Sequence, residues 1–196
     1  MCCGAASVPF KRTGTKTGID CMNIYENIEL LPPDLQGWNG KADIFGKLIQ
    51  QINPVTIIEV GTWKGQSAIT MAKVVPRGTK IYCVDTWLGA LEFMGQTGER
   101  DLMLKNGYPQ VYYQFLSNVI HNNCRDIIIP VPQTSTIAAR WFKKQGIKAE
   151  LIYIDGSHDE QDVYDDLCNY YDICTKVMFG DDWRHFADVE RAVTRS

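Results

Sequence analysis

Short apolar runs alternate along the chain with segments in which apolar residues recur every three or four positions. The runs predict five β-strands, at Ile57–Val60, Lys80–Trp87, Asp126–Val131, Glu150–Asp155 and Lys176–Phe179. The periodic segments predict α-helices at Ala42–Ile52, from Ser67 onward, at Val111–Ile120, Ile137–Lys144 and Asp159–Asp172. Strands that alternate with helices indicate an α/β fold: a doubly wound, mainly parallel sheet with helices on both faces.

The ends of this pattern mark the domain. Residues 1–20 are polar and rich in glycine and threonine, so we expect a flexible leader there. Residues 21–196 are expected to form a single domain, because a chain of 196 residues that is 45% hydrophobic can bury one sheet-centred core. The first part of that domain, Cys21–Trp38, is predicted to pack as an irregular or short helical segment over one edge.

The composition of the chain limits the classes of binding partner and the cellular compartment that we expect. Lysine and arginine number 20 against 23 acids, a net charge of −3 without a basic run, which disfavours a nucleic-acid partner. No stretch approaches the roughly 18 apolar residues of a membrane span. The seven cysteines form no metal-like CxxC pair, and Cys83, Cys168 and Cys174 fall within apolar patterns. We therefore predict buried thiols and a reducing, cytoplasmic compartment.

The segment Ile57–Ser67 joins the first predicted strand to a helix through a turn with Gly61 and Gly65. A doubly wound sheet binds its cofactor at such a loop. A dinucleotide fingerprint reads GxGxxG, whereas this loop reads ExGxxxG. The carboxylate of Glu59 suits an ammonium or sulfonium ligand, such as S-adenosylmethionine, better than it suits phosphates. The alternative is a strand–helix turn that binds no ligand.

Asp85 ends the second predicted strand, 26 residues after Glu59. An acid at this position of a βαβ unit accepts hydrogen bonds from ribose hydroxyls. The alternative is an ordinary turn aspartate. Two acids at adjacent strand ends, on either side of one glycine loop, favour the cofactor interpretation.

The connection that follows Trp87 is long and contains Gly89, Gly95 and Gly98. A long loop at the functional edge of a sheet is a candidate lid or substrate wall. A surface loop of no special role is the alternative.

Three acids follow the last two predicted strands: Asp155 ends the fourth, and Asp181 and Asp182 end the fifth. In a parallel sheet these ends meet at one edge, so the three carboxylates are expected to converge beside the glycine loop. A hard divalent cation such as Mg²⁺ or Mn²⁺ relieves the repulsion between converging carboxylates. The alternative is that Asp155 or Asp182 caps the helix that follows it.

Four segments resemble class I S-adenosylmethionine-dependent methyltransferases in their order and spacing: EVGTWKGQSAITMA, CVDTW, LIYIDGSHDEQDVYDDL and FGDDWRHFADVERAV. The likeness covers roughly Ile57 to Val193. It is closest to small metal-dependent O-methyltransferases, both the catechol type and the type that acts on macrolide sugars or rhamnosyl groups. This family implies a Rossmann-like methyltransferase fold. Its sheet continues into an antiparallel hairpin, which this sequence, ending one helix after the fifth predicted strand, is expected to lack.

The resemblance also implies roles for individual residues. Asp155, Asp181 and Asp182 would hold the Mg²⁺ or Mn²⁺ ion. The catechol type has a catalytic lysine three residues after its first metal aspartate, and His158 stands at that position here. His158, with Asp155, is therefore the predicted catalytic pair, and His185 is the competing base. The cofactor would be lined by Glu59, Gly61, Thr62, Trp63, Gly65, Ser67, Asp85, Thr86, Trp87, Ser135 and Asp155.

Two of these roles have structural alternatives, because Ser135 could cap the next helix, and His158 could merely orient Asp155 or cap the helix that follows it. Together the residues predict a metal-assisted, S-adenosylmethionine-dependent O-methyltransferase, with a homodimer also expected. The GSHDE variation and the long loop after Trp87 favour a sugar hydroxyl, in a glycan or glycoside with neighbouring hydroxyls, over a catechol. The alternatives from other classes are a non-catalytic cofactor-binding module and a nucleotide-sugar glycosyltransferase with Asp181 and Asp182 as its metal pair.

Overall fold

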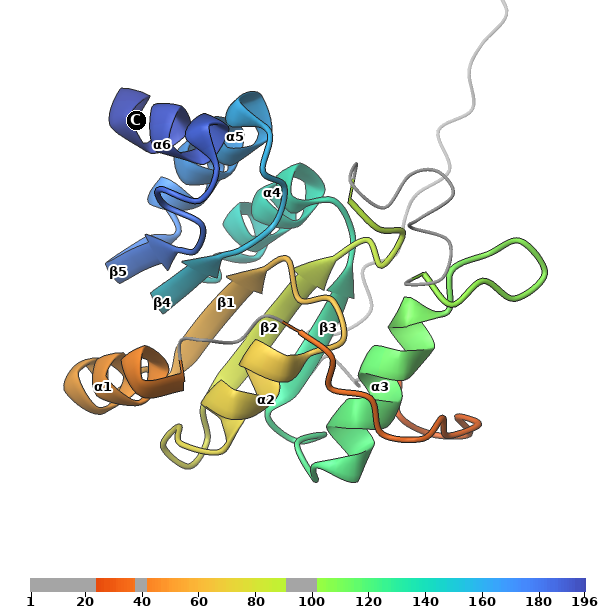
Figure 1. Ribbon diagram of the computed structural model, residues 1–196. Coiled ribbons are helices and arrows are strands. Elements are labelled where there is room, and N and C mark those ends of the chain that lie inside the picture. Colours follow the sequence, from red (N-terminus) through yellow and green to blue (C-terminus); the bar gives the residue numbers. More distant parts are fainter. Residues whose placement is uncertain (1–23, 38–41, 91–101) are drawn as a thin grey trace, which may run out of the picture.

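The computed structural model describes residues 24–37, 42–90 and 102–196. Within these residues, strands and helices alternate as predicted (Figure 1). The strands are β1 (Thr56–Val60), β2 (Lys80–Asp85), β3 (Ile128–Pro132), β4 (Ala149–Ile154) and β5 (Cys174–Gly180). The helices are α1 (Ala42–Ile52), α2 (Gln66–Ala72), α3 (Val111–His121), α4 (Ser135–Gln145), α5 (Glu160–Tyr171) and α6 (Ala187–Arg195).

The strands form one sheet in the order β3-β2-β1-β4-β5, and every neighbouring pair is parallel. The order reverses between β1 and β4, which is the switch point where open α/β sheets bind ligands. Val60 pairs with Val84 on one side and with Ile154 on the other, so the loops after β1, β2 and β4 begin side by side. The predicted doubly wound, parallel sheet is confirmed.

Alternating side chains of β1 divide the core into two layers. Ile57 faces the side covered by α1, α2 and α3, whereas Ile58 and Val60 face the side covered by α4 and α5 (Figure 1). Helix α6 packs on α5 through Val163, Val189 and Ala192. None of the described helices combines the length and the apolar character needed to cross a membrane.

Some boundaries and burials differ from the sequence prediction. Strand β2 ends at Asp85 rather than at Trp87, because Trp87 has a left-handed backbone with φ of 54° that leaves the strand direction. Of the three thiols predicted to be buried, Cys83 is buried, Cys174 is partly buried, and Cys168 is exposed on α5. The predicted leader and the loop glycines Gly95 and Gly98 lie outside the described residues.

Candidate active site

The carboxylate of Asp85 holds the loop that follows β1. Its Oδ2 accepts hydrogen bonds from the backbone N–H groups of Thr62 (3.0 Å) and Trp63 (2.8 Å), and its Oδ1 accepts one from the N–H of Trp87 (2.7 Å). The indole N–H of Trp87 in turn donates to the carbonyl of Trp63 (2.7 Å). Burial raises the pKa of Asp85, and these backbone donors oppose that rise. Asp85 therefore fixes the loop backbone as well as lining the cavity described below.

Glu59, the other acid beside the loop, is buried beneath it with an exposed fraction of 0%. The hydroxyl of Ser67, in the first turn of α2, donates to Glu59 Oε1, and the thiol of Cys83 on β2 lies 3.7 Å from Oε2. Burial raises the pKa of Glu59 to about 8, against the lowering effect of the Ser67 hydrogen bond. The carboxylate thus contacts the first turn of α2 and the neighbouring strand β2.

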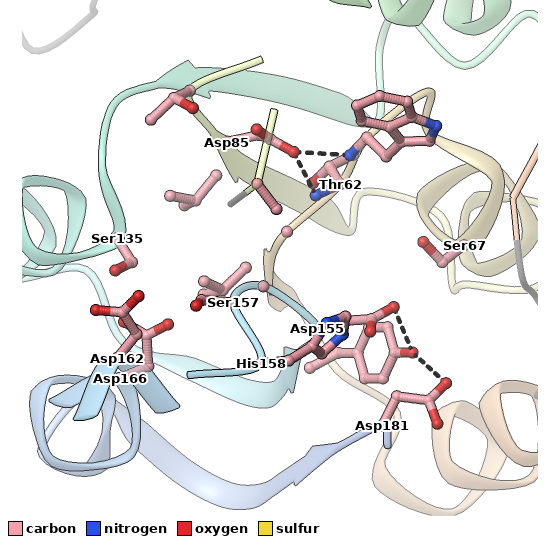
Figure 2. Close-up of a pocket in the computed structure, with 18 of the residues that line it drawn as sticks. Thr62, Ser67, Asp85, Ser135, Asp155, Ser157, His158, Asp162, Asp166 and Asp181 are labelled. Atoms are coloured by element: carbon pink, nitrogen blue, oxygen red, sulfur yellow. Dashed lines mark hydrogen bonds between the residues drawn. The ribbon is translucent and has the colours of Figure 1, made fainter. Parts of the chain in front are cut away.

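A cavity of about 1150 Å³ lies at the carboxyl edge of the sheet (Figure 2). Ligand pockets usually measure about 300–1,000 Å³, so this cavity has room for a cofactor together with an acceptor. The predicted cofactor residues that line it are Gly61, Thr62, Trp63, Ser67, Asp85, Thr86, Ser135 and Asp155. Glu59, Gly65 and Trp87 do not line it: Glu59 is buried under the loop, Gly65 packs toward Phe115, and the tilted ring of Trp87 packs against Phe115 in the core.

Ser135 reaches the cavity because a neighbour takes the capping role. Thr134 is the N-cap of α4, and its side chain accepts the N–H of Ile137. The hydroxyl of Tyr170 on α5 donates to the Ser135 carbonyl (3.0 Å), which ties the start of α4 to α5. The capping alternative for Ser135 is therefore wrong.

The hydroxyl group of Tyr153 links the side chains of Asp155 and Asp181. The phenol of Tyr153 on β4 contacts Asp155 Oδ2 (2.9 Å) and Asp181 Oδ2 (3.2 Å), as Figure 2 shows. Burial, together with the negative charges of the nearby Asp181 and Asp182, raises the pKa of Asp155 to about 6. Among the described residues, no three acidic, histidine or cysteine side chains are arranged so that together they could hold a metal ion.

Asp182 pairs with His158 across the loops that follow β4 and β5. His158 Nε2 lies 2.9 Å from Asp182 Oδ2, and its ring stacks on Phe186 with centroids 4.1 Å apart. His185 is 76% exposed, and its Nδ1 lies 3.9 Å from Asp182 Oδ1. The structure therefore positions His158 more firmly than the competing His185. Neither predicted acid caps a helix, because the N-caps of α5 and α6 are Asp159 and Phe186.

The sequence did not predict that acids of α5 line the cavity. Asp162, Asp165 and Asp166 do so, beside Ser135. Asp166 is 5% exposed, and burial raises its pKa to about 6. Asp162 and Asp166 are one helical turn apart, which is the only signal in the sequence that places them on one face.

The charges around the cavity are mostly negative. Lys64 is the only lysine or arginine among the described residues that line it, against seven aspartates. Lys64 is itself buried and forms an ion pair with Asp34 at 2.6 Å. A cavity of this charge favours cationic or neutral ligands over phosphates.

A strap, residues 31–36, runs along α3 and ends at the cavity, where Gln36 lines the wall. The buried side chain of Asn118 on α3 holds it: Oδ1 accepts the N–H of Asp34 (3.0 Å), and Nδ2 donates to the Asp34 carbonyl (2.6 Å). The same Nδ2 donates to the carbonyl of Lys64 in the glycine loop (2.8 Å). Asn118 therefore connects α3, the strap and the loop.

Asn118→Leu is expected to lower the free energy of unfolding by roughly 1–3 kcal/mol, the cost of leaving buried polar groups without partners. Urea unfolding measures the loss, and hydrogen exchange at the amide of Asp34 is expected to become faster. Asn122→Leu is the matched control, because within residues 24–37, 42–90 and 102–196 that C-cap side chain bonds to the Asn118 carbonyl and not to the strap. Equal losses in the two variants would show that Asn118 does not dock the strap.

A family model described as a methyltransferase domain matches residues 58–183, which is more than half of the chain. The match spans the glycine loop, Asp85, the carboxylates after β4 and β5, and His158. The chain belongs to this methyltransferase family. The prediction of a methyltransferase is therefore confirmed. No curated protein sequence matches the chain.

Solved structures share the fold of this methyltransferase at low sequence identity. An O-methyltransferase from Bacillus cereus in complex with SAH superimposes with a TM-score of 0.60 at 15% identity, covering 83% of this chain and 69% of the other. TomG from Streptomyces achromogenes, an O-methyltransferase involved in tomaymycin synthesis and solved with SAM, gives 0.58 at 14% identity, covering 83% and 68%. These likenesses confirm the Rossmann-like methyltransferase fold.

Proposed function

We propose that this protein is an S-adenosylmethionine-dependent O-methyltransferase that uses a divalent cation and methylates a sugar hydroxyl. The observation that carries the proposal is one cavity, in a chain of the methyltransferase family, that joins the glycine loop to Asp155, Asp181, Asp182 and His158. The structural neighbours that were solved with SAH or SAM support the choice of cofactor.

The cofactor lies across the carboxyl ends of β1 and β2 in this proposal. Ser135 and Ser67 lie on opposite sides of the cavity (Figure 2). We assign the adenosine to the Ser135 side, between the starts of α4 and α5, and the amino-acid group to the Ser67 side. The negative charge of the wall suits the ammonium and sulfonium groups.

His158 is the general base in this proposal. Asp182 Oδ2 lies 2.9 Å from its Nε2, and Phe186 stacks on its ring, so the imidazole has a fixed orientation at the cavity. A histidine ionises near neutral pH, which suits it to remove a proton from an acceptor hydroxyl. The oxygen then attacks the sulfonium methyl, and S-adenosylhomocysteine leaves.

Asp155 and Asp181 would hold the cation as a pair of carboxylates, whereas Asp182, the third predicted ligand, pairs with His158 in the structure. Two of these carboxylates already share one phenol oxygen, so they lie close together, and all-oxygen ligands suit Mg²⁺ or Mn²⁺. When bound, the ion would lower the pKa of the acceptor hydroxyl that it touches. The protein's own contribution is to gather the carboxylates and to orient His158 beside them.

A neutral acceptor with neighbouring hydroxyls fits this wall better than a nucleotide sugar. The seven lining aspartates repel a diphosphate, which counts against the glycosyltransferase alternative. Exposed aromatic rings near the β5–α6 loop, Trp183 and Phe186, can stack on a sugar face. The cytoplasmic location and the homodimer stay predictions.

Transfer of a radiolabelled methyl group from S-adenosylmethionine to a panel of glycosides and catechols tests the proposal. We expect transfer to a sugar with neighbouring hydroxyls, and a loss of about 100-fold or more with EDTA that Mg²⁺ reverses. The matched control is the same glycoside with one of the two hydroxyls replaced by hydrogen. Methyl transfer that EDTA does not affect would refute the role of a metal ion. Transfer only to catechols would refute the sugar acceptor. Failure to bind S-adenosylhomocysteine would refute the proposed function as a whole.

A further inference from the structure

Glu59 is separated from the cavity by Ser67. The glutamate is fully buried and does not line the cavity, whereas Ser67 does line it and donates its hydroxyl hydrogen to Glu59 Oε1. Along β1, Glu59 shares the face of Ile57, which is covered by α2, so its side chain lies under the first turn of that helix. Glu59 therefore does not contact a ligand in the cavity directly, and its hydrogen bond reaches the cavity through Ser67.

We propose that Glu59 is a positioning residue for the cofactor's amino-acid group: it fixes the hydroxyl of Ser67 and does not itself touch the cofactor. The inference rests on the function proposed above. A serine hydroxyl can occupy three staggered positions, and a single acceptor on its buried side selects one of them. The Ser67 oxygen then turns its remaining hydrogen-bonding capacity toward the cavity.

The surroundings of Glu59 support this role. The thiol of Cys83 lies 3.7 Å from Oε2, so both carboxylate oxygens have neutral donors beside them. Burial raises the pKa of this carboxyl to about 8, and neither of the two donors beside it carries a charge. A neutral side chain that keeps the acceptor oxygen should therefore keep the arrangement.

A double-mutant cycle separates action through Ser67 from direct contact. Calorimetry with S-adenosylhomocysteine is expected to give an affinity loss of about 10-fold for Ser67→Ala and about the same for Glu59→Met, which removes the acceptor. The double variant is expected to lose no more than Ser67→Ala alone. A loss of about 100-fold in the double variant, the product of the two, would mean independent contacts and would overturn the proposal.

Glu59→Gln keeps the acceptor oxygen and removes the charge, so it is expected to bind S-adenosylhomocysteine within about threefold of the natural protein. A loss of about 10-fold or more in this variant would indicate a direct charge contact and would overturn the proposal. Glu150→Gln is the matched control, because Glu150 accepts the N–H groups of Val55 and Thr56 at the opposite end of the sheet. If Glu59→Met does not fold, Glu59→Leu replaces it in the cycle, because leucine also removes the acceptor oxygen.

Methylthioadenosine, which lacks the amino-acid group, completes the experiment. The Glu59 and Ser67 variants are expected to bind it as the natural protein does. A matching loss for this ligand would show a general collapse of the loop and would overturn the proposal. Failure of the natural protein to bind S-adenosylhomocysteine would instead refute the proposed function, so the two failures are distinct.

Discussion

Replacing His158 by alanine is expected to lower kcat for methyl transfer roughly 100- to 10,000-fold, the usual contribution of a general base. Affinity for S-adenosylhomocysteine should change by less than about threefold, because the imidazole lies toward the acceptor side and pairs with Asp182. Initial-rate kinetics and calorimetry on the same preparation measure the two quantities.

Two further variants test whether His158, rather than His185, is the general base. Asp182→Asn should also lose activity while it keeps cofactor binding, because Asp182 orients His158 and is a predicted metal ligand. His185→Ala should keep most of the activity, since that side chain is 76% exposed and lies farther from Asp182. Loss of activity in His185→Ala, with His158→Ala unaffected, would transfer the role of base to His185.

Gly61→Ala is expected to destabilise the protein by roughly 2–5 kcal/mol and to abolish cofactor binding. A Cβ atom on Gly61 would lie 1.9 Å from the Asp155 carbonyl oxygen, and the residue has φ of +84°. The loop after β1 and the loop after β4 therefore cannot keep their present contact. Urea unfolding and calorimetry with S-adenosylhomocysteine measure the two effects.

Two glycines provide matched controls. Gly78 has φ of +94°, and an added Cβ atom would meet nothing within 4 Å, so Gly78→Ala isolates the backbone strain, about 1–2 kcal/mol. Gly46 lies in α1 with open space around it, and Gly46→Ala should stabilise the helix by about 0.5–1 kcal/mol. Equal losses for Gly61→Ala and Gly78→Ala would show that contact with Asp155 is not the cause.

The hydrophobic pattern determined the elements of this fold because each depends on neighbours in sequence. Helix α1 has the predicted bounds, and the apolar runs around Ile57 and Ile152 became the central strands β1 and β4. Strand β2 was predicted two residues too long, because the chain turns where the N–H of Trp87 bonds to Asp85, a contact with no hydrophobic signal.

The sequence also determined which acids would reach the functional edge, since side chains at the ends of parallel strands share that edge. Asp155, Asp181 and Asp182 line one cavity, as the strand ends predict. Only the tertiary structure decided what each acid contacts. Asp182 meets His158 because β4 and β5 are neighbours in the sheet, and Tyr153 joins Asp155 to Asp181 for the same reason.

The tertiary structure also decided the surroundings of two other acids, Glu59 and Asp166. A carboxylate at a strand end can point into the cavity or beneath the loop, and the packing of α2 placed Glu59 beneath it. Asp166 lies on a helix whose periodicity also fits an exposed face, and the start of α4 turned that face into a cavity wall. Local periodicity fixes where a side chain projects from its element, whereas the elements packed around it determine whether it meets solvent, a ligand or another side chain.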